Sequence, residues 1–198
     1  MQLLPRPQRQ TNKIGDLKKQ PQLQDVEKFK AFNEYQERVA IFINSSNLFD
    51  TATHLKFEID YTKLLHCLTN KRKLLRAYFY IAVDRTNEKQ QNFLHQMRRQ
   101  GYRVVAKELI QRSDGSKKAN LDIEIAVDML TLSRYCNTFI LLGADDELIC
   151  AVNAVSYKGV QVEVVSSDII NNNSLLSVAD RYIDLEKIKQ NFQKERVR

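Results

Sequence analysis

Acidic side chains stand just beyond apolar stretches of this sequence, where metal-ion chemistry is often built. We expect Asp122, Asp145 and Glu147 to converge on one divalent cation, because carboxylate oxygens are the ligands that Mg²⁺ and Mn²⁺ prefer. Asn44 follows the apolar run 38–43 in the same manner, and its amide oxygen can bind a cation without bringing charge. A cation held by these four residues would activate water for phosphodiester hydrolysis. They are the predicted catalytic and metal-binding set.

Two neighbouring acids are predicted to support this set. Asp122 and Asp128 lie six residues apart in a predicted helix, about 600° of rotation, so they cannot share one face. We expect Asp122 to face the site and Asp128 to act outside the metal's coordination shell. Asp145 and Asp146 would also stabilise the first turn of a helix by capping its free amides. The strand-end position of Asp145 nevertheless favours metal binding.

The elements that position these residues alternate between strands and helices from Arg38 onward. Predicted strands cover 39–43, 77–83, 103–109, 138–142 and 160–165, and predicted helices cover 61–68, 88–100, 120–132 and 146–157. Continuous apolar strands joined by helices predict a parallel sheet with helices on both faces. The expected fold class is therefore α/β, with a Rossmann-like parallel sheet of about five strands, whose carboxyl edge is the usual place for a ligand.

The two ends of the chain differ in composition from the middle. Residues 1–37 hold all three prolines and are rich in glutamine, so they are predicted to form a flexible arm that ends in a short amphipathic helix. Residues 38–186 carry the alternating strand and helix pattern. Residues 187–198 are strongly basic and are predicted to form a helical tail.

Charge is distributed unevenly along the chain. The formal net charge of +7 combines about +9 over residues 38–118 with about −8 over residues 119–186. Arg112, Lys117 and Lys118 form the basic group nearest to the acids, and such a group can hold a phosphate backbone by releasing its counterions. Solvated helix ends and loops would explain each basic group equally well.

Other features of the composition limit the class of protein. Cys67, Cys136 and Cys150 are widely spaced, so we expect free thiols in a reducing cytoplasm rather than disulfides. No apolar run approaches the roughly 20 residues of a membrane span, and no membrane association is predicted. His54, His66 and His95 lack the spacing of a metal site.

Three motifs together resemble the NYN domain, a PIN-like nuclease family, and in particular its LabA-like bacterial branch. The first is the strand that ends in Ile43–Asn47, which is similar to Asp-Gly-x-Asn in the family. The second is the lysine-rich turn and helix of Lys118–Asp128, which ends in Ala-Val-Asp. The third is the acidic run Gly143–Leu148, which is similar to Ser-Gly-Asp-x-Asp.

This resemblance implies a PIN/NYN-type fold whose acids hold Mg²⁺ or Mn²⁺ and hydrolyse RNA. By position, Asp122 and Asp145 match family acids, and Glu147 replaces an aspartate. Asn47 matches the asparagine that steadies the first loop, while Asn44 stands where the family has its leading aspartate. On this basis Arg112, Lys117 and Lys118 become candidates for the RNA-binding track.

Several alternatives stay open from the sequence. The change to Asn44 is also compatible with an inactive regulatory member of the family that binds RNA or a protein partner, or that forms a homo-oligomer. A Rossmann-type nucleotide binder is disfavoured because no GxGxxG follows the first strand. A phosphoacceptor receiver domain would use Asp84 at the end of a middle strand, but the acidic pair expected after the first strand is absent.

Overall fold

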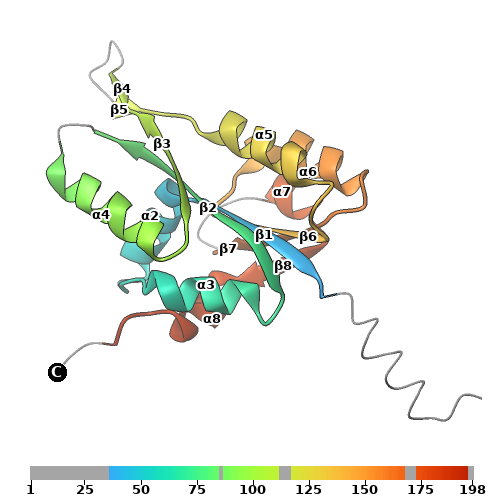
Figure 1. Ribbon diagram of the computed structural model, residues 1–198, viewed down its shortest axis with the longest axis horizontal. Helices are drawn as coiled ribbons and strands as arrows, with labels where there is room; N and C mark the ends of the chain where they lie inside the picture. The colour runs from blue at the N-terminus through green and yellow to red at the C-terminus, as the bar shows by residue number, and fades with distance from the viewer. Residues whose placement is uncertain (1–35, 85–86, 112–116, 168–172, 196–198) are drawn as a thin grey trace, which may run out of the picture. The chain divides into compact units, whose positions relative to one another are not determined.

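A parallel six-stranded sheet forms the centre of the domain (Figure 1). The computed structural model describes residues 36–84, 87–111, 117–167 and 173–195. The strands lie in the order β3-β2-β1-β6-β7-β8. They are β1 (Arg38–Asn44), β2 (Lys73–Val83), β3 (Arg103–Glu108), β6 (Thr138–Leu142), β7 (Gln161–Ser166) and β8 (Arg181–Asp184).

The strand order of the sheet has a topological switch point between β1 and β6. From β1 the chain moves outward through β2 and β3, and then returns to the other side of β1 as β6. Ile41 of β1 lies opposite Ala77 of β2 and Ile140 of β6. In open α/β sheets such a reversal leaves a crevice beyond the carboxyl ends of the two strands, where ligands bind. Asn44 and Gly143 lie at this crevice.

Helices cover both faces of the sheet (Figure 1). One face carries α2 (Ser45–His54), α3 (Tyr61–Thr69), α4 (Glu88–Arg99) and α8 (Leu185–Ile188). The other carries α5 (Asp122–Leu132), α6 (Ile149–Ser156) and α7 (Asn173–Leu176). Each face has its own apolar core: Phe79 and Met97 are fully buried in the first, and Phe139 and Met129 in the second. Burial of each such side chain stabilises the fold by roughly 1.5–3 kcal/mol.

Short elements complete the connections. A two-stranded antiparallel sheet joins β4 (Ile110–Gln111) to β5 (Lys117–Lys118) ahead of α5. The 3-10 helices are η1 (Asp146–Leu148), between β6 and α6, and η2 (Lys189–Asn191), after α8. None of the described helices is both long enough and apolar enough to cross a membrane.

The predicted α/β class with a parallel sheet is confirmed, and the differences lie in its details. The sheet has six strands rather than about five. The sixth, β8, was not predicted because it is four residues long and half of it is exposed. Helix α2 was not expected; it begins with Ser-Ser-Asn, and of its buried residues only Leu48 and Ala52 are apolar. Strand β2 begins at Lys73 instead of residue 77, and its first four residues are not buried.

The C-terminal segment packs against the domain, and of the predicted helical tail 187–198 the structure shows helical turns up to Asn191. After α8 and η2, Phe192 is fully buried in the first core, where its ring meets that of Phe57 at 5.8 Å. Gln193 then forms an antiparallel bridge with Ile59. The apolar anchor Phe192 thus ties the segment to the domain in spite of its basic composition. The predicted arm lies outside the described residues except for Gln36 and Glu37.

Candidate metal centre at the carboxyl edge of the sheet

Three of the predicted site acids lie together. One carboxylate oxygen from each of Asp122, Asp145 and Glu147 lies within 4.8 Å of the other two. Asp122 is the first residue of α5, while Asp145 and Glu147 follow β6. Among the described residues this is the one group of three or more potential metal-binding side chains. It lies at the reversal point between β1 and β6.

The acids border a cavity of about 330 Å³. Its wall also includes Asn44 and Asn47 from the end of β1 and the start of α2, together with Asn120 from the turn before α5. The structure therefore places the four predicted catalytic residues around one cavity, which both amide and carboxylate groups line. A group of oxygen donors of this kind suits a hard divalent cation.

Asn47, in the first turn of α2, joins this helix to the end of β6 at the cavity. Its side-chain amide nitrogen donates to the carbonyl oxygen of Gly143 at 2.7 Å. Gly143 has a positive φ of 70°, and a Cβ atom at this position would lie 2.8 Å from the backbone oxygen of Asn44. Glycine is therefore required here, since it accepts the left-handed conformation and leaves room for α2 to approach.

Asn44 caps the helix that follows it. Its side-chain oxygen accepts a hydrogen bond from the backbone N–H of Ser46 at 3.2 Å, and its φ of −81° and ψ of 109° are the extended values of an N-cap. Asparagine and aspartate cap helices about equally well. An amide at this position thus preserves the helix, but it supplies no negative charge to the cavity.

Asn120 organises the acids, and the sequence pattern had not singled it out. Its side-chain nitrogen donates to Glu147 Oε2 at 2.7 Å, and its side-chain oxygen accepts from the backbone N–H of Asp122 at 2.8 Å. The carbonyl of Asn120 in turn accepts from Lys107 Nζ at 2.8 Å. An asparagine two residues before a helix is a recognisable capping signal, which would have identified it.

The electrostatics of the cluster favour a bound cation. Burial, the hydrogen bond with Glu147 and the negative charges of Asp145 and Glu147 together raise the pKa of Asp122 from 3.8 to about 7. Asp122 Oδ1 is buried without a hydrogen-bond partner among the described residues. A divalent cation would offset the repulsion and complete the coordination of this oxygen. The residues present therefore fit Mg²⁺ or Mn²⁺.

The two acids predicted to support the site make contacts elsewhere. Asp128 Oδ2 accepts from the hydroxyl of Tyr80 at 2.8 Å, which ties α5 to β2 beneath the helix. Asp146 Oδ1 accepts from the backbone N–H of Leu175 at 2.8 Å, which ties η1 to α7. Neither carboxylate belongs to the acid cluster. Burial and the nearby Asp128 raise the pKa of Tyr80, so its hydroxyl remains the donor.

The predicted RNA-binding residues are only partly described. Lys117 and Lys118 form β5, which precedes the turn that carries Asn120. Arg112 lies outside the described residues. Their contact with nucleic acid remains a prediction.

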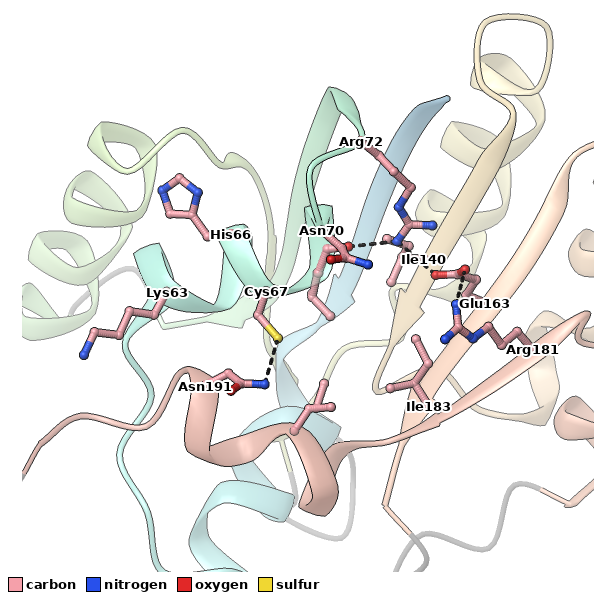
Figure 2. Close-up of a pocket in the computed structure, with 12 residues that line it drawn as sticks. Lys63, His66, Cys67, Asn70, Arg72, Ile140, Glu163, Arg181, Ile183 and Asn191 are labelled. Atoms are coloured by element: carbon pink, nitrogen blue, oxygen red, sulfur yellow. Dashed lines mark hydrogen bonds and ion pairs between the residues drawn. The ribbon is translucent and has the colours of Figure 1, made fainter. Parts of the chain in front are cut away.

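A larger cavity of about 540 Å³ lies at the opposite, amino-terminal edge of the sheet (Figure 2). Glu163 accepts there from Arg72 at 3.1 Å and from Arg181 at 3.4 Å, and Cys67 Sγ accepts from Asn191 at 3.9 Å. The two arginines and Glu163 thus connect the turn after α3 to β7 and β8. The larger cavity is thus lined by ion pairs that stabilise the fold, whereas the smaller one is lined by acids whose negative charges repel one another.

Comparison with known proteins identifies relatives of this chain in sequence and in fold. The chain is 30% identical over 165 residues to the low amplitude and bright protein LabA of Synechococcus elongatus, covering 79% of this chain and 88% of that protein. A crystal structure of a protein of unknown function from Vibrio parahaemolyticus has the same fold, with a TM-score of 0.70, 23% identity and coverage of 81% of this chain and 98% of that one. The profile of the NYN domain matches residues 38–186. The chain is therefore a member of the NYN domain family.

Proposed function

We propose that this NYN-domain protein is a Mg²⁺- or Mn²⁺-dependent ribonuclease that hydrolyses RNA phosphodiesters. The observation that carries the proposal is the cluster of Asp122, Asp145 and Glu147, whose oxygens lie within 4.8 Å of one another. Family membership supports it, and so does the position of the cluster at the reversal point of the sheet. A nucleotide-binding or receiver function has no comparable support.

The polar residues at and near the cavity would divide this activity among them. Asp122, Asp145 and Glu147 would hold the cation, which when bound orients and activates water for in-line attack on a phosphodiester. Asn120 donates to one oxygen of Glu147 and would hold this carboxylate in place beside the cation. Asp145 also accepts from the backbone N–H of Glu147 at 3.2 Å, which keeps the two acids in a fixed relation. Arg112, Lys117 and Lys118 would hold the RNA backbone before α5.

A second candidate function is RNA binding or protein binding without cleavage. The observation that favours it is Asn44, whose amide oxygen is engaged with Ser46 and whose side chain has no charge. Two unit charges about 4 Å apart attract by roughly 4 kcal/mol at an effective dielectric constant of about 20, so a missing negative charge weakens the attraction of a divalent cation by roughly twice that amount. A loss of that size would lower the occupancy of the cation at cellular concentrations.

Cleavage of a mixed pool of single-stranded and structured RNA with Mn²⁺ or Mg²⁺ distinguishes the two candidates. The chain would be compared with Asn44→Asp and with Asn44→Asp combined with Asp145→Asn. We expect cleavage by the unaltered chain, faster cleavage by Asn44→Asp and none by the double variant. RNA binding by all three proteins without any cleavage would overturn the nuclease proposal and favour the binding function.

A further inference from the structure

Lys107 of the edge strand β3 reaches the turn that carries Asn120. Its Nζ donates to the backbone carbonyl oxygen of Asn120 at 2.8 Å and pairs with Glu124 Oε1 at 2.7 Å. Lys107 lies opposite Ala82 in the sheet, and Ala82 belongs to the wall of the acid-lined cavity. The side chains of Lys107 and Glu124 are 35% and 33% exposed, so solvent screens them less than a surface pair. One ammonium group thus connects β3 to the start of α5 next to the cavity.

The carbonyl of Asn120 takes its donor from outside the helix. The N-cap of α5 is Leu121, whose carbonyl accepts from the backbone N–H of Ile125, so the carbonyl one residue earlier precedes the hydrogen bonds of the helix. Lys107 supplies the donor for it. Glu124 follows Asn120 by four residues, about one helical turn, and its carboxylate holds the ammonium group at this carbonyl.

Asn120 is consequently held at three points. Besides its carbonyl, its side-chain oxygen accepts from the backbone N–H of Asp122, and its side-chain nitrogen donates to Glu147 Oε2. Because the peptide unit is planar, fixing the carbonyl oxygen restricts rotation of the backbone at Asn120 and with it the direction of the side chain. The position of Glu147 relative to Asp122 therefore depends on a residue of β3.

We propose that Lys107 is a positioning residue of the metal centre, which acts through Asn120 to hold two acids of the cluster in place for the cation. This role rests on the proposed metal-dependent function, since it concerns the affinity of the same site for its cation. Residues that orient metal ligands from outside the coordination shell change metal affinity by about 10- to 100-fold. Glu124 contributes one step further out, because it keeps the ammonium group of Lys107 at the carbonyl of Asn120.

The charge of Lys107, taken alone, predicts the opposite effect on metal binding. A positive charge near the acids repels a divalent cation, so its removal would strengthen the binding of the metal. Removal of the paired negative charge of Glu124 would weaken that binding for the same reason. Positioning predicts instead that loss of Lys107 weakens metal binding although a repulsion disappears. Variants that change the charge and the contact independently can therefore separate the two effects.

Calorimetric titration of Mn²⁺ into two variants of the full chain makes this separation. Glu124→Gln removes one negative charge but keeps Lys107 and an acceptor oxygen for it. The pair variant, Lys107→Met with Glu124→Gln, has the net charge of the unaltered chain but lacks the contact. We expect the pair variant to bind Mn²⁺ about 10-fold more weakly than the unaltered chain, and also more weakly than Glu124→Gln. Binding by the pair variant that equals or exceeds that of Glu124→Gln overturns the positioning role.

Two controls test whether the loss is specific and whether it passes through Asn120. Lys194→Met with Glu58→Gln removes an ion pair of the same residue types, 3.2 Å apart, outside the acid cluster. It should leave the affinity for Mn²⁺ unchanged, and circular dichroism checks that both double variants keep the fold. In an Asn120→Ala background the Lys107 pair variant should cause little further loss, because the connection to the acids is already broken. A full additional loss, or an equal loss in the Lys194 control, overturns the proposal.

Hydrogen exchange of the Asp122 backbone N–H provides a readout that requires no cation. This N–H donates to the side chain of Asn120, so in the metal-free protein the Lys107 pair variant should exchange it at least about 3-fold faster than Glu124→Gln does. Faster exchange in a chain whose unaltered form binds no Mn²⁺ would refute the metal centre, and the role of Lys107 with it. Mn²⁺ binding by the unaltered chain together with unchanged exchange in the pair variant would refute the role of Lys107 alone.

Discussion

Asn120 donates a hydrogen bond from its side-chain nitrogen to Glu147 Oε2 at 2.7 Å, while its side-chain oxygen caps the N–H of Asp122. One amide thus sets the positions of two acids that come from different elements. Residues that orient metal ligands in this way typically contribute about 10- to 100-fold to metal affinity. We expect Asn120→Ala to weaken Mn²⁺ binding by about that factor. Calorimetric titration measures it, with the exposed Asn92→Ala as control; equal affinities of the two variants would contradict a positioning role.

The pKa of Asp122 predicts how stability depends on pH in the metal-free protein. The folded state raises this pKa from 3.8 to about 7, so the folded protein keeps a proton that the unfolded chain has lost. The free energy of unfolding that this group contributes therefore decreases as pH rises from about 4 to about 7 and is constant above that range. Denaturation in EDTA at several pH values measures the slope.

Two variants isolate the contribution of Asp122 to that slope. The free energy of unfolding of Asp122→Asn should depend less on pH between pH 4 and 7 than that of the unaltered chain, because the amide does not titrate. Asp146→Asn should keep the slope, because this neighbouring acid lies outside the cluster. In the unaltered chain and in Asp146→Asn, Mn²⁺ should stabilise the fold more at pH 8 than at pH 6, since the cation competes with the proton on Asp122. A slope that survives in Asp122→Asn would refute this assignment.

Substitutions of Gly143 and Gly159 together test the close contact between the end of β6 and α2. Both have positive φ, but a Cβ at Gly143 would lie 2.8 Å from the oxygen of Asn44, whereas a Cβ at Gly159 meets nothing within 4 Å. We expect Gly159→Ala to reduce the free energy of unfolding by about 1 kcal/mol through backbone strain alone. Gly143→Ala should cost about 3 kcal/mol because the clash adds to the strain. Urea denaturation compares them, and equal losses would argue against the close contact.

Lys117 and Lys118 are predicted to contact the RNA backbone. Replacing both by alanine should weaken RNA binding across sequences and lower the salt dependence of the binding constant by about one to two ion equivalents. Fluorescence anisotropy at several salt concentrations measures this slope. The control replaces Arg98 and Arg99, in the last turn of α4, by alanine, which removes the same charge elsewhere on the domain. An unchanged slope in the Lys117 and Lys118 variant would exclude these residues from the RNA track.

The sequence was sufficient to predict the parallel sheet and to single out three acids that the fold brings together. Continuous apolar runs identified β1 and β6, whose residues are nearly all buried, and acids beyond such runs indicated Asp122, Asp145 and Glu147. Strand β8 was missed because a four-residue, partly exposed strand has little pattern of its own. Its place in the sheet depends on pairing with β7, which no local rule can reveal.

Contacts between distant residues were the part that the sequence did not reveal. Asn120 acts through Glu147, which lies 27 residues away, and Phe192 is held by a core built largely from earlier elements. Asp146 was predicted to support the site beside Asp145, yet its carboxylate accepts from the N–H of Leu175. Only the folded arrangement distinguishes a metal-binding acid from a neighbour that serves as a cap.

The difference between Asp145 and Asp146 allows the most direct test of the metal centre. Titration of Mn²⁺, followed by its electron paramagnetic resonance signal, should show one ion bound per chain. Asp145→Asn should reduce this binding at least about 10-fold by removing a charged ligand, while Asp146→Asn keeps its acceptor for Leu175 and should bind Mn²⁺ as the unaltered chain does. Undiminished binding in Asp145→Asn, or an equal loss in both variants, would contradict a metal centre built on Asp122, Asp145 and Glu147.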